Sequence, residues 1–253
     1  MEKWRLLKTG YANAYRNMAI DEAILYAHSK ELAPPTVRFY QWNPSAISIG
    51  YFQSLEREVD IDECHRRGID YVRRITGGGA VYHDKELTYS IVISENHPEI
   101  PSNILESYHR ICGAIIKGLY NIGINSRYSP INDILVDGRK ISGNAQTRKY
   151  KTVLQHGTIL IDVDVDTMFT LLKVPDEKIK DKFIANVKDR VTSIRKIRGE
   201  EISFDKLADA LKKGFEEEFN IKLVEGKLTE EEEEFAEEFE KNRFSKKEWN
   251  YRR

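Results

Sequence analysis

The chain has 253 residues, of which 40% are hydrophobic and 32% charged, so it holds enough apolar material for one sizeable core. Its 40 basic and 41 acidic residues give a net charge of −1, which provides no overall positive field for binding nucleic acid or an anionic membrane. The amino terminus lacks the apolar core of a signal peptide and no stretch is long and apolar enough to span a bilayer, so we expect a cytoplasmic protein.

Helical and strand-like patterns alternate along the first two thirds of the chain. Apolar residues at helical spacing predict a helix over residues 13–29. Residues 37–42 and 46–51 then have the composition of strands, and an Asn-Pro pair between them supplies a turn. Two runs rich in β-branched residues, 87–93 and 153–161, predict strands of a central sheet.

Three further helices are predicted from apolar spacing and capping residues. Residues 104–122 have apolar positions three or four apart, which is typical of an amphipathic helix. Ser203 and Thr229 are expected to cap two later helices, the second of which carries an acidic run. Because no repeat or flexible linker interrupts the chain, we predict a single domain over residues 1–253, with its core at about 30–220 and a helical appendage at 221–253.

The stretch RRITGGGAVYHD, residues 73–84, is the most informative in the chain. Three consecutive glycines allow backbone conformations closed to other residues, so successive N–H groups can turn toward a phosphate or carboxylate. Two arginines just upstream add charged donors. The stretch is neither a Walker loop nor the GxGxxG of a dinucleotide fold, and a plain glycine turn with surface arginines is about as probable from this pattern alone.

Two other segments carry polar residues on predicted strands. Asp137 and Gly138 form a hairpin turn signal, which places Lys140 near the start of the returning strand. Lys140 is either held firmly there or is an ordinary exposed lysine. His156 and Thr158 alternate with apolar residues and would share one face of their strand, where a histidine is more often a packing residue than a catalyst.

The order and spacing of five motifs resemble the lipoate–protein ligase A family over nearly the whole chain. The motifs are RRITGGGAVYHD, NDILVDGRKISGNA, LQHGTILI, RVTSI and KKEWNY. The resemblance implies an α+β fold similar to the catalytic domain of biotin–protein ligases and related to class II aminoacyl-tRNA synthetases, with a mixed sheet flanked by helices. It also implies activation of lipoate with ATP to lipoyl-AMP, followed by transfer to a protein lysine.

Carried over residue by residue, the resemblance assigns a site. Lys140 is expected to be catalytic and to contact both nucleotide and lipoate, because a fixed ammonium stabilises charge that builds on phosphoryl oxygens. Lipoate is expected to contact Gly78 and His156 as well. Magnesium is expected to help neutralise ATP, with Asn132 and Asp133 as candidate oxygen ligands. ATP or lipoyl-AMP is expected to contact Lys140 together with Arg74, Gly77, Gly78, Gly79, Ala80, Val81 and Tyr82.

The same motifs also resemble a sister group, the octanoyltransferases, which move octanoate from acyl carrier protein through a cysteine thioester. That group has its cysteine a little upstream of the Gly-Arg-Lys turn, but the only cysteines here are Cys64 and Cys112, and neither stands at that place. Gly79 also matches the ligases, where the transferases tend to have arginine. On these grounds the sequence favours an ATP-dependent ligase over a transferase.

The larger ligases of this family continue into a small domain after a Trp-Asn pair, which stands here at Trp249 and Asn250. The resemblance therefore suggests a separate accessory subunit, and acceptors that are lipoyl domains of 2-oxoacid dehydrogenase E2 or the glycine-cleavage H protein. Other hypotheses are an octanoyltransferase that works without a cysteine, a subunit that transfers preformed lipoyl-AMP without adenylating, a lipoate-binding scaffold, and, remotely, a biotin ligase.

Overall fold

The computed structural model describes residues 1–174 and 180–253 of the chain. The strands are β1 (Glu2–Ala12), β2 (Thr36–Trp42), β3 (Ala46–Ile49), β4 (Asp70–Arg73), β5 (Val81–His83), β6 (Glu86–Ser94), β7 (Arg127–Ser129), β8 (Asp133–Val136), β9 (Arg139–Lys149), β10 (Thr152–Leu160) and β11 (Ile221–Glu225). The helices are α1 (Ala14–Ser29), α2 (Leu55–Glu58), α3 (Ile61–Arg67), α4 (Ile104–Tyr120), α5 (Val165–Leu171), α6 (Lys180–Arg190), α7 (Ile194–Arg198), α8 (Phe204–Phe219), α9 (Glu230–Phe239) and α10 (Lys247–Asn250), with a π-helical turn, Glu240–Phe244, after α9.

An eight-stranded mixed sheet forms the centre of the molecule, with the strand order β11-β1-β2-β6-β10-β9-β8-β7. β1 is parallel to both β11 and β2, whereas the pairs from β2 to β7 are antiparallel. The two β-branched runs of the sequence are neighbours in this sheet, because β6 and β10 pair along their whole length. The predicted central strands are therefore confirmed.

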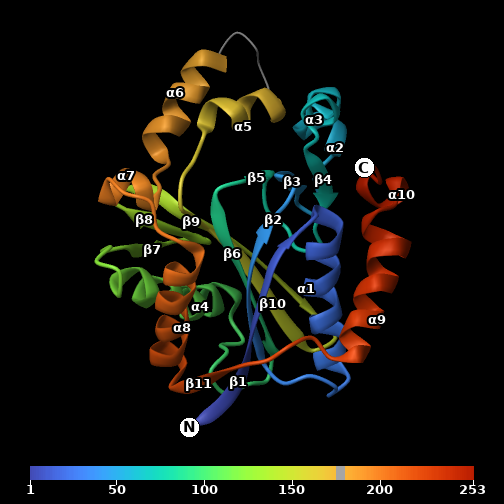
Figure 1. Ribbon diagram of the computed structural model, residues 1–253, viewed down its shortest axis with the longest axis vertical. Coiled ribbons are helices and arrows are strands. Elements are labelled where there is room, and N and C mark those ends of the chain that lie inside the picture. Colours follow the sequence, from blue (N-terminus) through green and yellow to red (C-terminus); the bar gives the residue numbers. More distant parts are fainter. Residues whose placement is uncertain (175–179) are drawn as a thin grey trace.

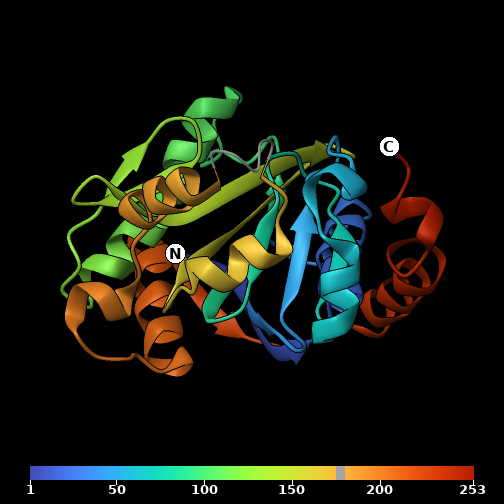
Figure 2. The ribbon, with the colours of Figure 1, turned by 90° about the horizontal axis from the view of Figure 1, so that it is seen from above.

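Helices cover both faces of this sheet (Figures 1 and 2). Side chains alternate between the faces, so that Ile91 and Val153 pack with α4 and α8 in one core, whereas their neighbours Val92 and Leu154 pack with α1 in another. Helix α9 lies outside α1 and contributes Ala236 to this second core. The expected α+β architecture, a mixed sheet between helical layers, is confirmed.

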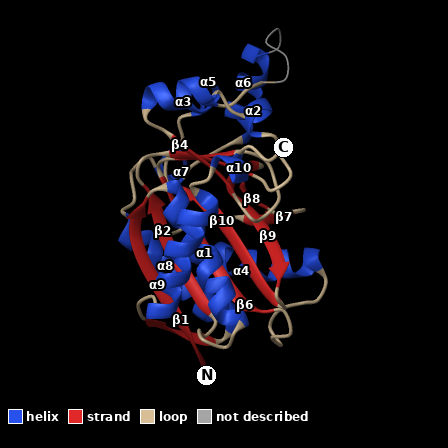
Figure 3. Cartoon of the chain, turned by 90° about the vertical axis from the view of Figure 1, so that its right-hand side faces the viewer, coloured by secondary structure: helices blue, strands red, loops and turns tan. Residues whose placement is uncertain are grey.

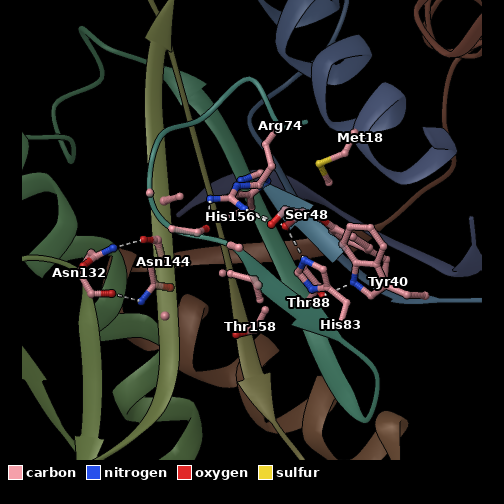
Figure 4. Close-up of a pocket in the computed structure, with 18 of the residues that line it drawn as sticks. Met18, Tyr40, Ser48, Arg74, His83, Thr88, Asn132, Asn144, His156 and Thr158 are labelled. Carbon is pink, nitrogen blue, oxygen red and sulfur yellow. Dashed lines mark hydrogen bonds between the residues drawn. The ribbon is translucent and has the colours of Figure 1, made fainter. Parts of the chain in front are cut away.

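A smaller three-stranded sheet, ordered β4-β3-β5, lies at one end of the molecule beside α2, α3, α5 and α6 (Figure 3). The segment between β4 and β5 is the glycine-rich stretch of the sequence, residues 74–80, which from here on is called the glycine loop. It is therefore suspended between two strands of the small sheet, at the edge that faces the large one (Figure 4).

The predicted capping residues are present. Asn13 accepts a hydrogen bond from the backbone of Arg16 at the start of α1, and Ser203 caps α8 in the same way. Thr229 and Glu232 form a complete capping box at the start of α9. These helices consequently begin where the sequence predicts.

The predicted strand over residues 46–51 is wrong at its end, because β3 stops at Ile49. The carbonyl groups of Gly50 and Tyr51 instead turn to accept hydrogen bonds from the buried guanidinium of Arg73. Gly50 also lies against the glycine loop so closely that a Cβ there would be 2.0 Å from the carbonyl oxygen of Gly78. The chain leaves the sheet at this point in order to pack against the loop.

The segment predicted as a helical appendage, residues 221–253, begins with a strand of the main sheet. β11 pairs with β1, and Ile221 and Leu223 are buried in the same core as α8. Strand β1 and helix α1 likewise contribute buried residues before position 30, including Trp4, Leu6 and Ile24. The hydrophobic core thus draws on both ends of the chain. Within residues 1–174 and 180–253, no helix has the length and apolar character needed to cross a membrane.

Candidate active site

A cavity of about 140 Å³ lies between the glycine loop and the large sheet (Figure 4). Strands β2, β6, β9 and β10 supply its walls on the side of the large sheet, β3 and β5 on the side of the small sheet, and Met18 of α1 closes one end. Its lining combines an apolar part, which includes Met18, Trp42 and Val81, with a polar part that includes Arg74 and Lys140. A cavity of this composition suits a ligand with an apolar tail and a polar head.

Most of the residues predicted for the site line this cavity. Lys140, His156, Asn132, Arg74 and residues 78–81 do so, although they come from distant parts of the chain. Gly77 faces a different hollow, beside Tyr51 and Trp249, and Tyr82 packs among apolar residues of the small sheet. These two positions, and Asp133, are not brought to the cavity.

Within the glycine loop only Gly78 has a backbone conformation that requires glycine, with φ +97°. Gly77 and Gly79 have ordinary negative φ, contrary to the expectation that all three glycines use special conformations. No hydrogen bond in the described part of the chain uses the amide N–H of Gly77, Gly78 or Gly79 as a donor. Gly78 and Gly79 therefore line the cavity with amides whose hydrogen bonds are still to be made.

Arg74 holds the loop in place from behind. Its guanidinium donates to the carbonyl oxygens of Gly77 and Gly79, both at 2.9 Å, to the carbonyl and hydroxyl of Ser48, and more weakly to Thr76. Every N–H of the group is thus engaged within the protein. Burial lowers the pKa of Arg74 to about 10, and no carboxylate of the described residues forms an ion pair with it. A buried positive charge without an anion beside the cavity favours a ligand that carries or develops negative charge there.

Lys140 occupies the opposite rim of the cavity. The side chain folds across Gly143, whose missing Cβ leaves the space that the lysine fills, and its amine forms an ion pair of 2.7 Å with Asp133. The side chain is 41% exposed. Lys140 is therefore neither a wholly solvated turn residue nor a buried charge, and its amine lies at the mouth of the cavity.

The magnesium assignment to Asn132 and Asp133 stays a prediction. Asn132 lines the cavity, but its amide group donates to the backbone of Asn144, while the carboxylate of Asp133 is held by Lys140. Among the residues that the structure describes, no group of three or more His, Cys, Asp or Glu side chains could hold a metal ion. No step of the chemistry below is routed through a metal.

A first histidine-centred chain lies on the α1 side of the cavity. Nδ1 of His156 is 3.0 Å from Asp21 of α1, and its Nε2 is 2.7 Å from the hydroxyl of Thr76 in the glycine loop. Asp21 in turn pairs with the buried Arg38. Burial lowers the pKa of His156, with Asp21 opposing that effect. For Asp21, burial raises the pKa, but Arg38 and His156 outweigh it and the pKa falls below its usual value.

A second histidine-centred chain, absent from the predicted site, lies on the small-sheet side. His83 of β5 has its Nδ1 2.6 Å from Glu86 and its Nε2 2.7 Å from the hydroxyl of Ser48 on β3. In the β3–β5 register, Ala46 pairs with His83 and Ser48 with Val81, so the side chains of Ser48 and His83 are diagonal neighbours on one face. Both line the cavity.

Neither cysteine is at the cavity. Cys64 is fully buried on α3 behind the small sheet, and Cys112 is fully buried on α4, where the amide of Gln155 donates to its sulfur over 3.9 Å. Mainly through burial, the pKa of both thiols is raised to about 12. Both cysteines are thus protonated, enclosed and remote from the lining, which is the environment of a structural residue rather than a nucleophile.

A family model described as "Lipoyl protein ligase A/B catalytic domain" matches residues 13–216. The chain belongs to this family. Octanoyltransferase LipM from Brevibacillus brevis is 40% identical over 276 residues that cover all of both proteins. Octanoyltransferase LipM from Bacillus subtilis is 38% identical over 275 residues, which cover all of this chain and 99% of that protein.

Solved structures of the lipoyl protein ligase A/B family superpose closely. A bi-partite lipoate protein ligase from Thermoplasma acidophilum, described with its E2 lipoyl domain, has a TM-score of 0.89 at 33% identity, covering 99% of this chain and 97% of that one. A lipoate-protein ligase A bound with ATP has a TM-score of 0.85 at 32% identity, covering 99% of each chain. A biotin protein ligase from Aquifex aeolicus, at 13% identity over 85% of this chain and 70% of that one, shares the fold alone, with a TM-score of 0.51. The expected likeness to biotin–protein ligases is confirmed.

The expectation of an ATP-dependent lipoate ligase is wrong. The curated relatives that match the whole chain at 36–40% identity are octanoyltransferases, the activity that the sequence analysis kept as an alternative. The error came from the missing cysteine, which excludes one kind of nucleophile but not the reaction. Ligases and transferases of this family share the fold and the loop motifs, so these features assign a lipoylating enzyme without separating the two classes.

Proposed function

We propose that this chain transfers an octanoyl group from the thioester of an acyl carrier protein to a lysine of a lipoyl domain. The observation that carries the proposal is the 40% identity to an octanoyltransferase along the full length of both proteins. The lipoyl domains of 2-oxoacid dehydrogenase E2 and the glycine-cleavage H protein are the acceptors, and the reaction takes place in the cytoplasm. ATP is not consumed, because a thioester is already an activated acyl group.

The cavity lining supports an acyl ligand. Met18, Trp42 and Val81 offer apolar surface to the octanoyl tail, whose burial contributes roughly 0.8 kcal/mol for each methylene. The carbonyl end lies toward Arg74 and Lys140, where negative charge that develops on the carbonyl oxygen is stabilised by fixed positive charge. Orientation of the substrate thus follows from the separation of apolar and polar lining.

The remaining predicted residues take roles in acyl binding rather than in nucleotide binding. The amides of Gly78 and Gly79 supply donors toward the carbonyl oxygen, with Ala80 and Val81 forming the wall beside them. Lys140 adds an ammonium at the mouth, which the acceptor lysine passes. His156 positions the loop through its contact with Thr76.

Acceptor docking is proposed at the β9–β10 end beside the cavity mouth, where Arg139 is exposed. Two other basic residues of this region are partly engaged inside the protein, because Arg148 donates to backbone carbonyls at Pro101 and Ser102, and Lys149 pairs with Glu22. An acidic lipoyl domain approaching this surface would meet Arg139 and Lys140 first.

The test compares two acyl sources with one acceptor. The purified chain is incubated with a lipoyl domain and either octanoyl carrier protein without ATP, or octanoate with ATP and magnesium. We expect the acceptor to gain the mass of one octanoyl group in the first mixture. Modification confined to the second mixture would overturn the proposal, and repeating both with a candidate accessory subunit tells whether a second chain is needed. An acceptor whose target lysine is replaced by arginine is the control.

A further inference from the structure

The structure offers an oxygen nucleophile where a thiol is missing. We propose that Ser48 attacks the octanoyl thioester with His83 as general base and carries the octanoyl group as an oxygen ester; this rests on the proposed function. The hydroxyl, the ring and Glu86 form a continuous hydrogen-bonded chain with contacts of 2.7 and 2.6 Å. Nucleophile, base and an acid that orients the base are the parts that hydroxyl catalysis requires.

The proton arrangement in this chain is set by Glu86. Its Oε1 accepts from the hydroxyl of Thr88 at 2.7 Å and from Nδ1 of His83, so the ring carries its proton on Nδ1. Nε2 is then the acceptor, and the hydroxyl of Ser48 donates to it. The base consequently faces the proton that must leave when the oxygen attacks.

The imidazole is held rigidly in this orientation. The indole of Trp42 stacks on the ring of His83, with 4.0 Å between centroids and 16° between planes. The same indole donates to Thr88, which also donates to Glu86, so ring, acid and stacking partner share one network. A base fixed in this way needs little rearrangement in the transition state.

Arg74 supplies the charge that an attacking serine oxygen needs. Its Nη1 donates to the hydroxyl oxygen of Ser48 at 2.8 Å, and no carboxylate of the described chain neutralises the guanidinium. The hydroxyl therefore donates to a base and accepts from a buried cation at the same time. Figure 4 shows Arg74, Ser48 and His83 meeting at the cavity. A nearby positive charge stabilises the developing alkoxide and favours the anionic transition state.

The two half-reactions balance without any further reagent. In the first, the oxygen of Ser48 bonds to the thioester carbonyl carbon, the carbon–sulfur bond breaks, and the serine proton passes through His83 to the departing thiolate. In the second, the uncharged amine of the acceptor lysine bonds to the same carbon, the carbon–oxygen bond breaks, and a proton from the amine passes through His83 back to Ser48. The enzyme ends as it began.

The first experiment traps the acyl-enzyme. The full chain is mixed with octanoyl carrier protein in the absence of acceptor and quenched, and intact mass and peptide mapping are measured. We expect one octanoyl group on the peptide that contains Ser48. It should survive neutral hydroxylamine, which cleaves thioesters, and be released by alkaline hydroxylamine, which cleaves oxygen esters as well. Addition of the lipoyl domain should move the label to the acceptor.

Variants separate this inference from the proposed function. Ser48→Ala should form no adduct and lose about 10³-fold in acceptor modification, and Ser48→Cys should form an adduct that neutral hydroxylamine removes. Ser45→Ala is the matched control, because Ser45 precedes the same strand but bonds to Asp84 and does not line the cavity.

Each outcome has one meaning. If the wild-type protein modifies the acceptor but the label lies elsewhere, or Ser48→Ala keeps its rate within about 10-fold, Ser48 is not the nucleophile and the octanoyltransferase proposal stands. If the wild-type protein does not modify the acceptor from the carrier protein, the octanoyltransferase proposal itself fails. Should Ser48→Ala not fold, the wild-type adduct and its hydroxylamine sensitivity decide the question.

Discussion

Two chains of carboxylate, histidine and hydroxyl stand on either side of Arg74, and they differ in what surrounds them. In the first, Asp21 also pairs with Arg38 at 2.8 Å and accepts hydrogen bonds from Tyr40 and Ser90. In the second, Glu86 has no cation within ion-pair distance among the described residues apart from His83, and one of its oxygens has no partner. The first carboxylate is thus fully engaged in holding the fold, whereas the second serves its histidine.

The hydroxyl ends of the two chains differ as well. Thr76 is buried outside the cavity lining, and its oxygen fixes the glycine loop to His156. Ser48 is equally buried from bulk solvent but lines the cavity that would receive the acyl group. Similar hydrogen-bond geometry therefore serves structure in one place and, by our proposal, chemistry in the other, and access to the substrate makes the difference.

The sharpest way to break this comparison is to remove each histidine in turn. His83→Asn should lower kcat for octanoyl transfer by about 10³-fold, because the general base is lost. His156→Asn should act mainly through KM, because it loosens the glycine loop rather than the proton path. Steady-state kinetics with octanoyl carrier protein measures both. Equal losses of kcat in the two variants would show that the chains are not functionally distinct.

Removing the negative charge from each carboxylate should separate stability from activity. Asp21→Asn leaves Arg38 buried without its ion pair and should lower the free energy of unfolding by about 3–5 kcal/mol. Glu86→Gln leaves no cation unpaired and should cost no more than about 1 kcal/mol, while octanoyl transfer falls strongly. Urea denaturation beside the activity assay tests the pair. A larger loss of stability in Glu86→Gln than in Asp21→Asn would contradict the division of roles.

The rim of the cavity offers a smaller test, which compares adjacent basic residues. Lys140→Ala should reduce octanoyl transfer by about 10²-fold, because an ammonium near the developing oxyanion is lost. Stability should change by less than about 1 kcal/mol, since the ion pair with Asp133 is partly exposed. Arg139→Ala, one residue earlier and solvent-exposed, is the control. Equal effects of the two changes would mean that Lys140 acts only through surface charge.

The smallest expected effect is a pH dependence of stability that arises from His156. Burial lowers its pKa in the folded protein, so on acidification below its ordinary value of 6.5 the unfolded chain takes up a proton that the folded chain does not. The free energy of unfolding should therefore fall as pH drops through this range. Urea denaturation at pH 7.5 and 5.5 should show a smaller decrease in His156→Asn. His28, whose pKa burial also lowers, contributes to the slope that remains.

Local signals in the sequence predicted much of the fold. Capping residues such as Asn13 and Thr229 fix helix starts within one turn of chain, and β-branched runs identify β6 and β10. Strands β1 and β11 were not predicted. They form the parallel edge of the sheet between residues about 220 positions apart, and no local pattern encodes such a pairing.

The site divides in the same way. The glycine loop, the Asp137–Gly138 hairpin and the strand position of His156 follow from local chemistry, and so does the absence of a cysteine near the hairpin. Ser48 and His83 were not joined by any sequence signal, because their contact depends on the register between β3 and β5. Sequence order places reactive groups on elements, but a proton moves only between atoms within hydrogen-bond distance, and those distances are set by tertiary packing.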